Sequence, residues 1–173
     1  MKRLARFAAT VLVALAALTL PAGASAAPAS TSFAIAGFEY AFTSTVGSFA
    51  GAGVGNGDRA VWNTRVEHDA LGSAPTYING GSFRMVARSP TGTLDSVTGT
   101  FIHHGGTITT LSTGPKCTNQ RFLVAGALQD VATTTSSGGS GTFSVVLTHY
   151  RIRLFGQCLI YSARVVGNVA FAY

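Results

Sequence analysis

Four histidines, His68, His103, His104 and His149, are the side chains of this 173-residue sequence that titrate near neutral pH without a perturbing environment. A zinc site needs three or four ligands, and the sequence contains no H-x-H, H-E-x-x-H or C-x-x-C motif. His103 and His104 are adjacent, so a regular strand would point them to opposite faces. We therefore expect no metal and no other cofactor, and His68 and His149 are the candidate general bases.

The segment Trp62–Asp69 holds the densest group of ionisable residues. On a strand, its odd-numbered residues from Asn63 to Asp69 would share one face, and Trp62, Val66 and His68 would lie on the other. One interpretation, which we favour, is an edge strand with a charged outer face. The other places His68 beside Trp62 in a pocket, as a hydrogen-bonding group or general base.

Glu39 lies within the strongly apolar run from Phe33 to Phe42. Alternation puts it on the same face as Phe33 and Ile35, which would bring its carboxylate against apolar side chains as a candidate catalytic group. The alternative, which we favour, makes that face the exposed one and assigns Phe38, Tyr40 and Phe42 to the core.

Other candidate ligand-binding residues are Arg151, whose planar guanidinium could receive a carboxylate, and the aromatic residues Trp62, Tyr40 and Tyr161. Arg151 also fits an ordinary surface role. No G-x-S-x-G motif presents a nucleophilic serine. Acidic residues are too few to predict the paired carboxylates of a glycoside hydrolase.

Cys117 and Cys158 are the only cysteines, and the N-terminal residues of the sequence indicate export. Lys2, Arg3 and Arg6 precede an apolar run from Phe7 to Leu20, and Ala24-Ser25-Ala26 is typical of a signal-peptidase site. We expect residues 1–26 to be removed as a signal peptide, leaving no transmembrane anchor and a secreted, extracellular protein. The Ala-rich leader resembles those of Gram-positive bacteria of high GC content. In that oxidising location the two cysteines are expected to form a disulfide.

Cleavage would leave 147 residues, a common size for one domain, and a net charge of +3 in place of +6. The basic residues are dispersed, so the sequence does not indicate binding to nucleic acid. We expect residues 27–32 to be a short flexible leader and residues 33–173 to form a single β domain.

Period-two alternation between turn residues predicts eight strands, and no window has a sustained helical period. They cover residues 33–42, 60–70, 81–88, 94–104, 107–112, 121–131, 141–155 and 157–173. Gly105-Gly106 and Gly156-Gln157 are predicted as tight hairpin turns, and short links favour antiparallel pairing. The predicted fold is therefore an all-β, single-domain antiparallel barrel of about eight strands, or alternatively a two-layer β-sandwich.

One predicted strand has an apolar face that becomes polar along its length: Val145 and Leu147 are followed on it by His149 and Arg151. Two explanations are open. A bulge near Leu147 could exchange the faces, which we favour, or one end of the strand could reach a polar cavity mouth or solvent.

The starts Gly81-Ser82-Phe83, Gly99-Thr100-Phe101 and Gly141-Thr142-Phe143, with the Gly138-Gly139-Ser140-Gly141 turn, resemble the barrel of the allene oxide cyclase and dirigent proteins. The resemblance covers about half of the chain. It implies an eight-stranded antiparallel barrel around an apolar cavity for a lipid-like or phenolic ligand, and it assigns no catalytic residue.

Three functions are compatible with these features. The first is a secreted barrel that binds a small apolar or lipid-like ligand without catalysis. The second is a small secreted enzyme, an isomerase or esterase acting on an apolar substrate with His68 or His149 as base. The third is an extracellular structural or interaction module, which would have a filled core. The sequence leaves the ligand and the oligomeric state open.

Overall fold

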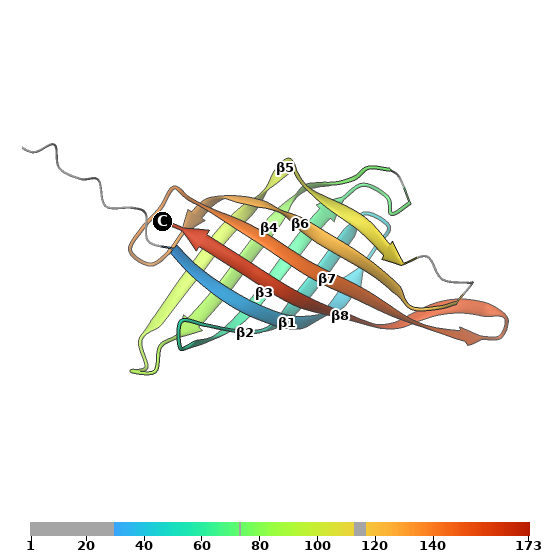
Figure 1. Ribbon diagram of the computed structural model, residues 1–173, viewed down its shortest axis with the longest axis horizontal. Helices are drawn as coiled ribbons and strands as arrows, with labels where there is room; N and C mark the ends of the chain where they lie inside the picture. The colour runs from blue at the N-terminus through green and yellow to red at the C-terminus, as the bar shows by residue number, and fades with distance from the viewer. Residues whose placement is uncertain (1–29, 73, 113–116) are drawn as a thin grey trace, which may run out of the picture.

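A computed structural model describes residues 30–72, 74–112 and 117–173. Within them, eight antiparallel strands form a closed barrel in which each strand pairs with its sequence neighbours and β8 closes against β1 (Figure 1). The all-β, eight-stranded antiparallel barrel predicted from the sequence is thus confirmed. The strands are β1 (Ser30–Phe42), β2 (Val46–Gly55), β3 (Asp58–His68), β4 (Thr76–Arg88), β5 (Leu94–Ser112), β6 (Gln120–Ala132), β7 (Gly139–Leu154) and β8 (Gln157–Ala172).

Apolar residues that alternate along most of the strands line the barrel interior. Phe33 and Phe171 pack together with Phe83, and Met85 and Val131 are fully buried. Serine, threonine, arginine and asparagine occupy many of the alternate, outward positions. Burial of this inner face is the main stabilising contribution, because a closed barrel has one core and no free edge. β3 pairs with β2 and β4, so our interpretation of it as an edge strand is wrong.

The predicted number of strands, eight, is correct although two strands were predicted wrongly: one was missed and another was divided in two. β2 was missed, because its inward positions include Gly47, Gly51 and Gly53, which give no apolar alternation. The predicted Gly105-Gly106 hairpin is wrong, since both glycines lie inside the 19-residue β5, where the pairing with β6 shifts register. The expected signal peptide lies outside the described residues. Residues 30–32, predicted as flexible leader, belong to β1.

β-Bulges occur in β1 and β8, close to the same end of the barrel. The β1–β2 register passes from the Glu39↔Phe49 pair to Ala41↔Ser48, which leaves Tyr40 as the extra residue. Similarly, Tyr161 is extra in β8, between the partners of Tyr150 and Arg151. The predicted bulge near Leu147 is therefore wrong: pairing there is regular, and the strand reaches the mouth of a cavity.

β7 and β8 continue beyond the barrel wall as a hairpin. β6 pairs with β7 only as far as His149, and β1 pairs with β8 only as far as Arg164, so within the described chain residues 150–162 pair only with one another. This ribbon projects past the other strands in Figure 1. The predicted disulfide is present: Cys117 joins Cys158 with their Cα atoms 5.3 Å apart, which ties the hairpin to the segment before β6.

The hairpin turns at Phe155-Gly156, one residue earlier than predicted, with Leu154 paired to Gln157. Both turn residues have positive φ, 49° and 79°. The described part of the chain contains no helix long and apolar enough to cross a membrane.

Candidate functional site

A cavity of about 640 Å³ opens at the end of the barrel from which the hairpin projects. We call this cavity the cup. It is bounded by the ends of β1, β3, β5 and β7, the beginnings of β6 and β8, and residues of the β1–β2 and β3–β4 connections. Its apolar lining includes Phe49, Val66, Phe122, Val124 and Leu147. A volume in the range of 300–1,000 Å³ is typical of sites for small organic molecules.

Glu39 and His149 form a buried pair in the lining of the cup. His149 Nε2 lies 3.0 Å from Glu39 Oε2, and the two side chains are 5% and 4% exposed. The edge of the Phe122 ring faces the imidazole at a centroid distance of 5.4 Å, and Phe42 lies 6.3 Å away. A hydrogen bond between such groups is stronger than the same bond in water, because the apolar surroundings have a low dielectric constant.

The local sequence explains how Glu39 enters the barrel. Alternation from Phe33 and Ile35 continues inward to Glu39, and Gly47 on β2 leaves room for it: a Cβ at Gly47 would lie 2.8 Å from Glu39 Oε1. The bulge at Tyr40 then turns Phe42 into the cup as well. The assignment of Phe38, Tyr40 and Phe42 to the core is therefore wrong, since they are 55%, 60% and 55% exposed.

His68 lines the cup at the end of β3, four strands around the barrel from His149 on β7. It is buried, and its Nδ1 is 2.6 Å from the Asp69 backbone oxygen, so Nδ1 carries the proton and donates. The predicted inward face of Trp62, Val66 and His68 is confirmed. However, Trp62 and His68 line different spaces.

Arg151 lines the cup near its opening, next to Ile160 on β8. Its backbone N–H donates to Asn119 Oδ1 at 3.2 Å. Four sequence candidates, Glu39, His68, His149 and Arg151, are thus brought together in one cavity, although they come from three strands.

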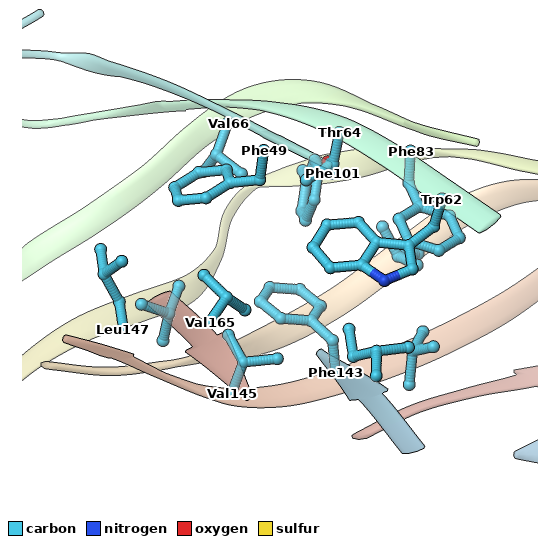
Figure 2. A pocket seen from close by; sticks show the side chains of 14 residues that line it. Phe49, Trp62, Thr64, Val66, Phe83, Phe101, Phe143, Val145, Leu147 and Val165 are labelled. Atoms are coloured by element: carbon cyan, nitrogen blue, oxygen red, sulfur yellow. The ribbon is translucent and has the colours of Figure 1, made fainter. Parts of the chain in front are cut away.

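Trp62 lines a separate cavity of about 50 Å³ within the core, which Figure 2 shows surrounded by Phe83, Phe101 and Phe143. Its Nε1–H donates to the Ala52 backbone oxygen at 3.0 Å, so its polar atom is satisfied. The space is too small for a ligand of ordinary size. Four side chains, Phe49, Val66, Val124 and Leu147, line both this cavity and the cup and thus separate them.

Tyr40 and Tyr161, predicted as cavity or rim aromatics, are the extra residues of the two bulges. They are 60% and 65% exposed, and neither lines the cup or the core cavity. The bulge shifts the alternation at Tyr161 away from the inward face of Ala163 and Val165. Tyr40 instead belongs to the face of Phe38, which is already outward before the bulge in β1.

Sequence reasoning missed Phe42, Phe122, Thr110 and Gln120 as cup residues. Phe122 and Thr110 are directly paired across β5 and β6, and both face inward. An available signal was the alternation of Phe122, Val124 and Leu128, but only the strand order shows that this face meets His149.

The cup therefore offers apolar walls, one buried Glu–His pair, a second histidine and an arginine. This arrangement can enclose an apolar molecule and hold one polar group of that molecule. No cluster of three or more metal-binding side chains occurs in the described ranges.

The geometry defines a class of protein: a closed antiparallel β-barrel with a solvent-open cavity at one end. No family model matches the chain, and no curated protein or solved structure matches it significantly.

Proposed function

We propose that this protein is a secreted binding protein that holds one small, largely apolar molecule in the cup without converting it. The observation that carries the proposal is an open cavity of about 640 Å³ with apolar walls and a buried Glu39–His149 pair. The disulfide supports a location outside the cell, where such bonds persist. A structural module with a filled core would not account for a cavity of this size.

The chemistry of the cup favours a ligand with one hydrogen-bonding group on an apolar body. Phe49, Phe122 and Leu147 supply apolar area, whose burial contributes about 25 cal/mol for each Å² removed from water. Arg151 and His149 are among the lining groups that can donate hydrogen bonds to an anionic or carbonyl oxygen, together with the side chains of Thr110 and Gln120. A ligand of lipid-like or phenolic chemistry meets both requirements.

Native mass spectrometry of the oxidised protein, purified from culture medium, tests the proposal directly. We expect extra mass on the native protein that is lost on denaturation. Titration with 1-anilinonaphthalene-8-sulfonate, which has an aromatic body and one anionic group, provides a second measurement. We expect saturable binding of one equivalent and competition by the released ligand.

A matched pair of variants locates the binding. Thr110 lines the cup, whereas the neighbouring Thr109 pairs with Leu123 and points outward. Thr110→Trp should place a bulky ring in the cup and abolish binding of the probe, and Thr109→Trp should leave it unchanged. Equal binding by the two variants would contradict a site in the cup.

The buried pair also supports a second function, an isomerase or esterase. A histidine oriented by a carboxylate is the arrangement of a general base, and His149 is the residue that Glu39 orients. Two measurements distinguish the two functions. If the protein is an enzyme, His149→Gln should abolish turnover of its substrate. If it is a binding protein, the native ligand released from the wild type should be recovered unchanged.

A further inference from the structure

The end of the β7–β8 hairpin carries a group of exposed apolar side chains. Ile152, Leu154 and Leu159 are 43%, 45% and 44% exposed, and Phe155 is fully exposed. Ile152 pairs with Leu159, so these two lie on one face of the ribbon, and by alternation Leu154 shares it. We call these four residues the hairpin tip. Because the ribbon projects beyond the barrel, the tip is the first part of this end to meet another surface (Figure 1).

Phe155 is an unfavourable residue for the turn that it occupies. A φ of 49° is rarely adopted by a bulky side chain, and the ring gains no burial within the chain in compensation. The β2–β3 connection has the same two-residue geometry with the suitable residues: Asn56 and Gly57 have φ values of 51° and 84°. A bulky residue at a turn position with positive φ, without burial in return, indicates that Phe155 has a functional role.

The charged residues of the two hairpin strands are all basic. No acidic residue follows Asp130 in the sequence, and β7 and β8 carry Arg151, Arg153 and Arg164. Arg153 is exposed and is separated from Phe155 by a single residue. Tyr150 and Tyr161 lie behind the tip, with ring centroids 6.3 Å apart. Along the hairpin from its turn toward the barrel, the apolar tip and Arg153 therefore come first, the two tyrosines follow, and the barrel wall comes last.

We propose that the hairpin tip docks this protein on an anionic lipid surface. Phe155 and its apolar neighbours would enter the boundary between head groups and acyl chains. Arg153 would extend its charged end to the lipid phosphates, and the tyrosines would lie at head-group level. Charge complementarity selects this partner, because an apolar tip with only basic neighbours fits a negatively charged lipid surface.

Docking in this way would bring the cup close to the membrane. Arg151 and Ile160 line the cup and belong to the strands that form the hairpin, so the opening and the tip are at the same end of the barrel. The Cys117–Cys158 bond fixes the ribbon relative to the barrel, which an isolated two-stranded hairpin would not achieve.

Co-sedimentation with vesicles tests the proposal, using the purified oxidised protein. We expect binding to vesicles of phosphatidylglycerol mixed with phosphatidylcholine, and much weaker binding to phosphatidylcholine alone. Phe155→Asn should lower the partition coefficient by about tenfold, from the loss of one buried aromatic ring. Arg153→Gln should lower it by about fivefold on the anionic vesicles only.

Two control variants lie at the opposite end of the barrel. Leu94 is 62% exposed and Arg88, its partner in β4, is exposed, so Leu94→Asn and Arg88→Gln remove equivalent groups. Both should bind as the wild type does. Phe155→Asn creates the Asn-Gly pair found in the β2–β3 turn and should therefore fold at least as stably as the wild type. Leu154→Thr, which suits a strand, provides a second tip variant.

Failure of the wild type to bind anionic vesicles would overturn the proposal, as would equal binding by the tip variants and the controls. A vesicle-free dimer that Phe155→Asn dissociates would show that a second copy covers the tip, and would also overturn it. Thr110→Trp separates this result from the function of the cup, because it should bind vesicles normally while losing the probe.

Discussion

Asp69 closes the connection between β3 and β4. Its carboxylate accepts a hydrogen bond from Asn79 Nδ2 at 2.8 Å and another from the Tyr77 backbone N–H at 3.0 Å. These two bonds, the Asn79 bond foremost, hold the pKa of the Asp69 carboxyl below its ordinary value of 3.8. The folded state is therefore stabilised by the ionised carboxylate.

The sign of this effect predicts how stability depends on pH. A depressed pKa in the folded state contributes stability above the unfolded value of 3.8, and the contribution is lost as the pH falls through the lower folded pKa. Asp69→Asn should thus be less stable than the wild type near neutral pH, with a difference that vanishes in acid. Urea unfolding at a series of pH values measures this. Asp58→Asn is the control, and a constant difference at all pH values would contradict the prediction.

The buried Glu39–His149 pair gives a second prediction at the residue scale. Replacing one partner with an apolar residue, as in Glu39→Leu or His149→Phe, leaves the other buried without its partner and should cost roughly 2–5 kcal/mol of unfolding free energy. The double variant should recover most of that loss, yet bind the probe poorly. Urea denaturation and probe titration check the two parts. Additive losses in the double variant would show that the two residues do not interact.

The sequence indicated which side chains could form a site, but it did not indicate which face of the barrel wall each of them would occupy. Histidine, arginine and a carboxylate in an apolar run could be selected from the sequence, and Glu39, His68, His149 and Arg151 do meet in the cup. Glu39 follows the inward alternation of Phe33 and Ile35, but the space above Gly47 that admits its carboxylate leaves no periodic signal.

At the scale of the elements, β1 and β2 approach closely because glycines face each other. Gly37 pairs with Gly51, and a Cβ at Gly37 would meet the Ala50 backbone oxygen and lie 2.6 Å from Trp62 Cζ2. Neither the backbone nor the buried indole can move aside easily. The glycine is therefore required by close packing.

Gly37→Ala should accordingly lower the free energy of unfolding by about 1–3 kcal/mol, the usual cost of overpacking a core. Thermal or urea unfolding measures the change. Ala36→Ser is a suitable control, since Ala36 is the adjacent, exposed residue of the same strand. If both substitutions have the same small effect, the packing of Trp62 against Gly37 is not limiting.

The same glycines explain why strand prediction succeeded for most elements and failed for two. β3, β6 and β7 place apolar residues inward at most alternate positions, and the sequence predicted them with small boundary errors. β2 has glycine at several inward positions, Gly47, Gly51 and Gly53, so its alternation is hidden. Gly105-Gly106 has the composition of a turn, but pairing with β6 keeps it within β5.

For the whole molecule, closure of the barrel and the disulfide are separate sources of stability. β8 pairs with β1 over Ser30 to Phe38, which completes the wall without help from the cysteines. The Cys117–Cys158 bond crosses 41 positions of the sequence and constrains mainly the unfolded chain.

We predict that Cys117→Ser combined with Cys158→Ser lowers the free energy of unfolding by roughly 2–4 kcal/mol while the barrel still folds. Far-ultraviolet circular dichroism should keep its strand signal, and urea unfolding should give the loss. The wild type treated with reductant should behave like the double variant. Loss of the strand signal at room temperature would contradict independent closure of the barrel.

The small cavity around Trp62 also determines how the protein responds to hydrostatic pressure. Such a void is eliminated when the chain unfolds, and the loss of volume on unfolding grows with the size of the void, here about 50 Å³. Compression should thus favour the unfolded state, and a molecule held in the cup would leave this internal void, and the volume it releases, in place.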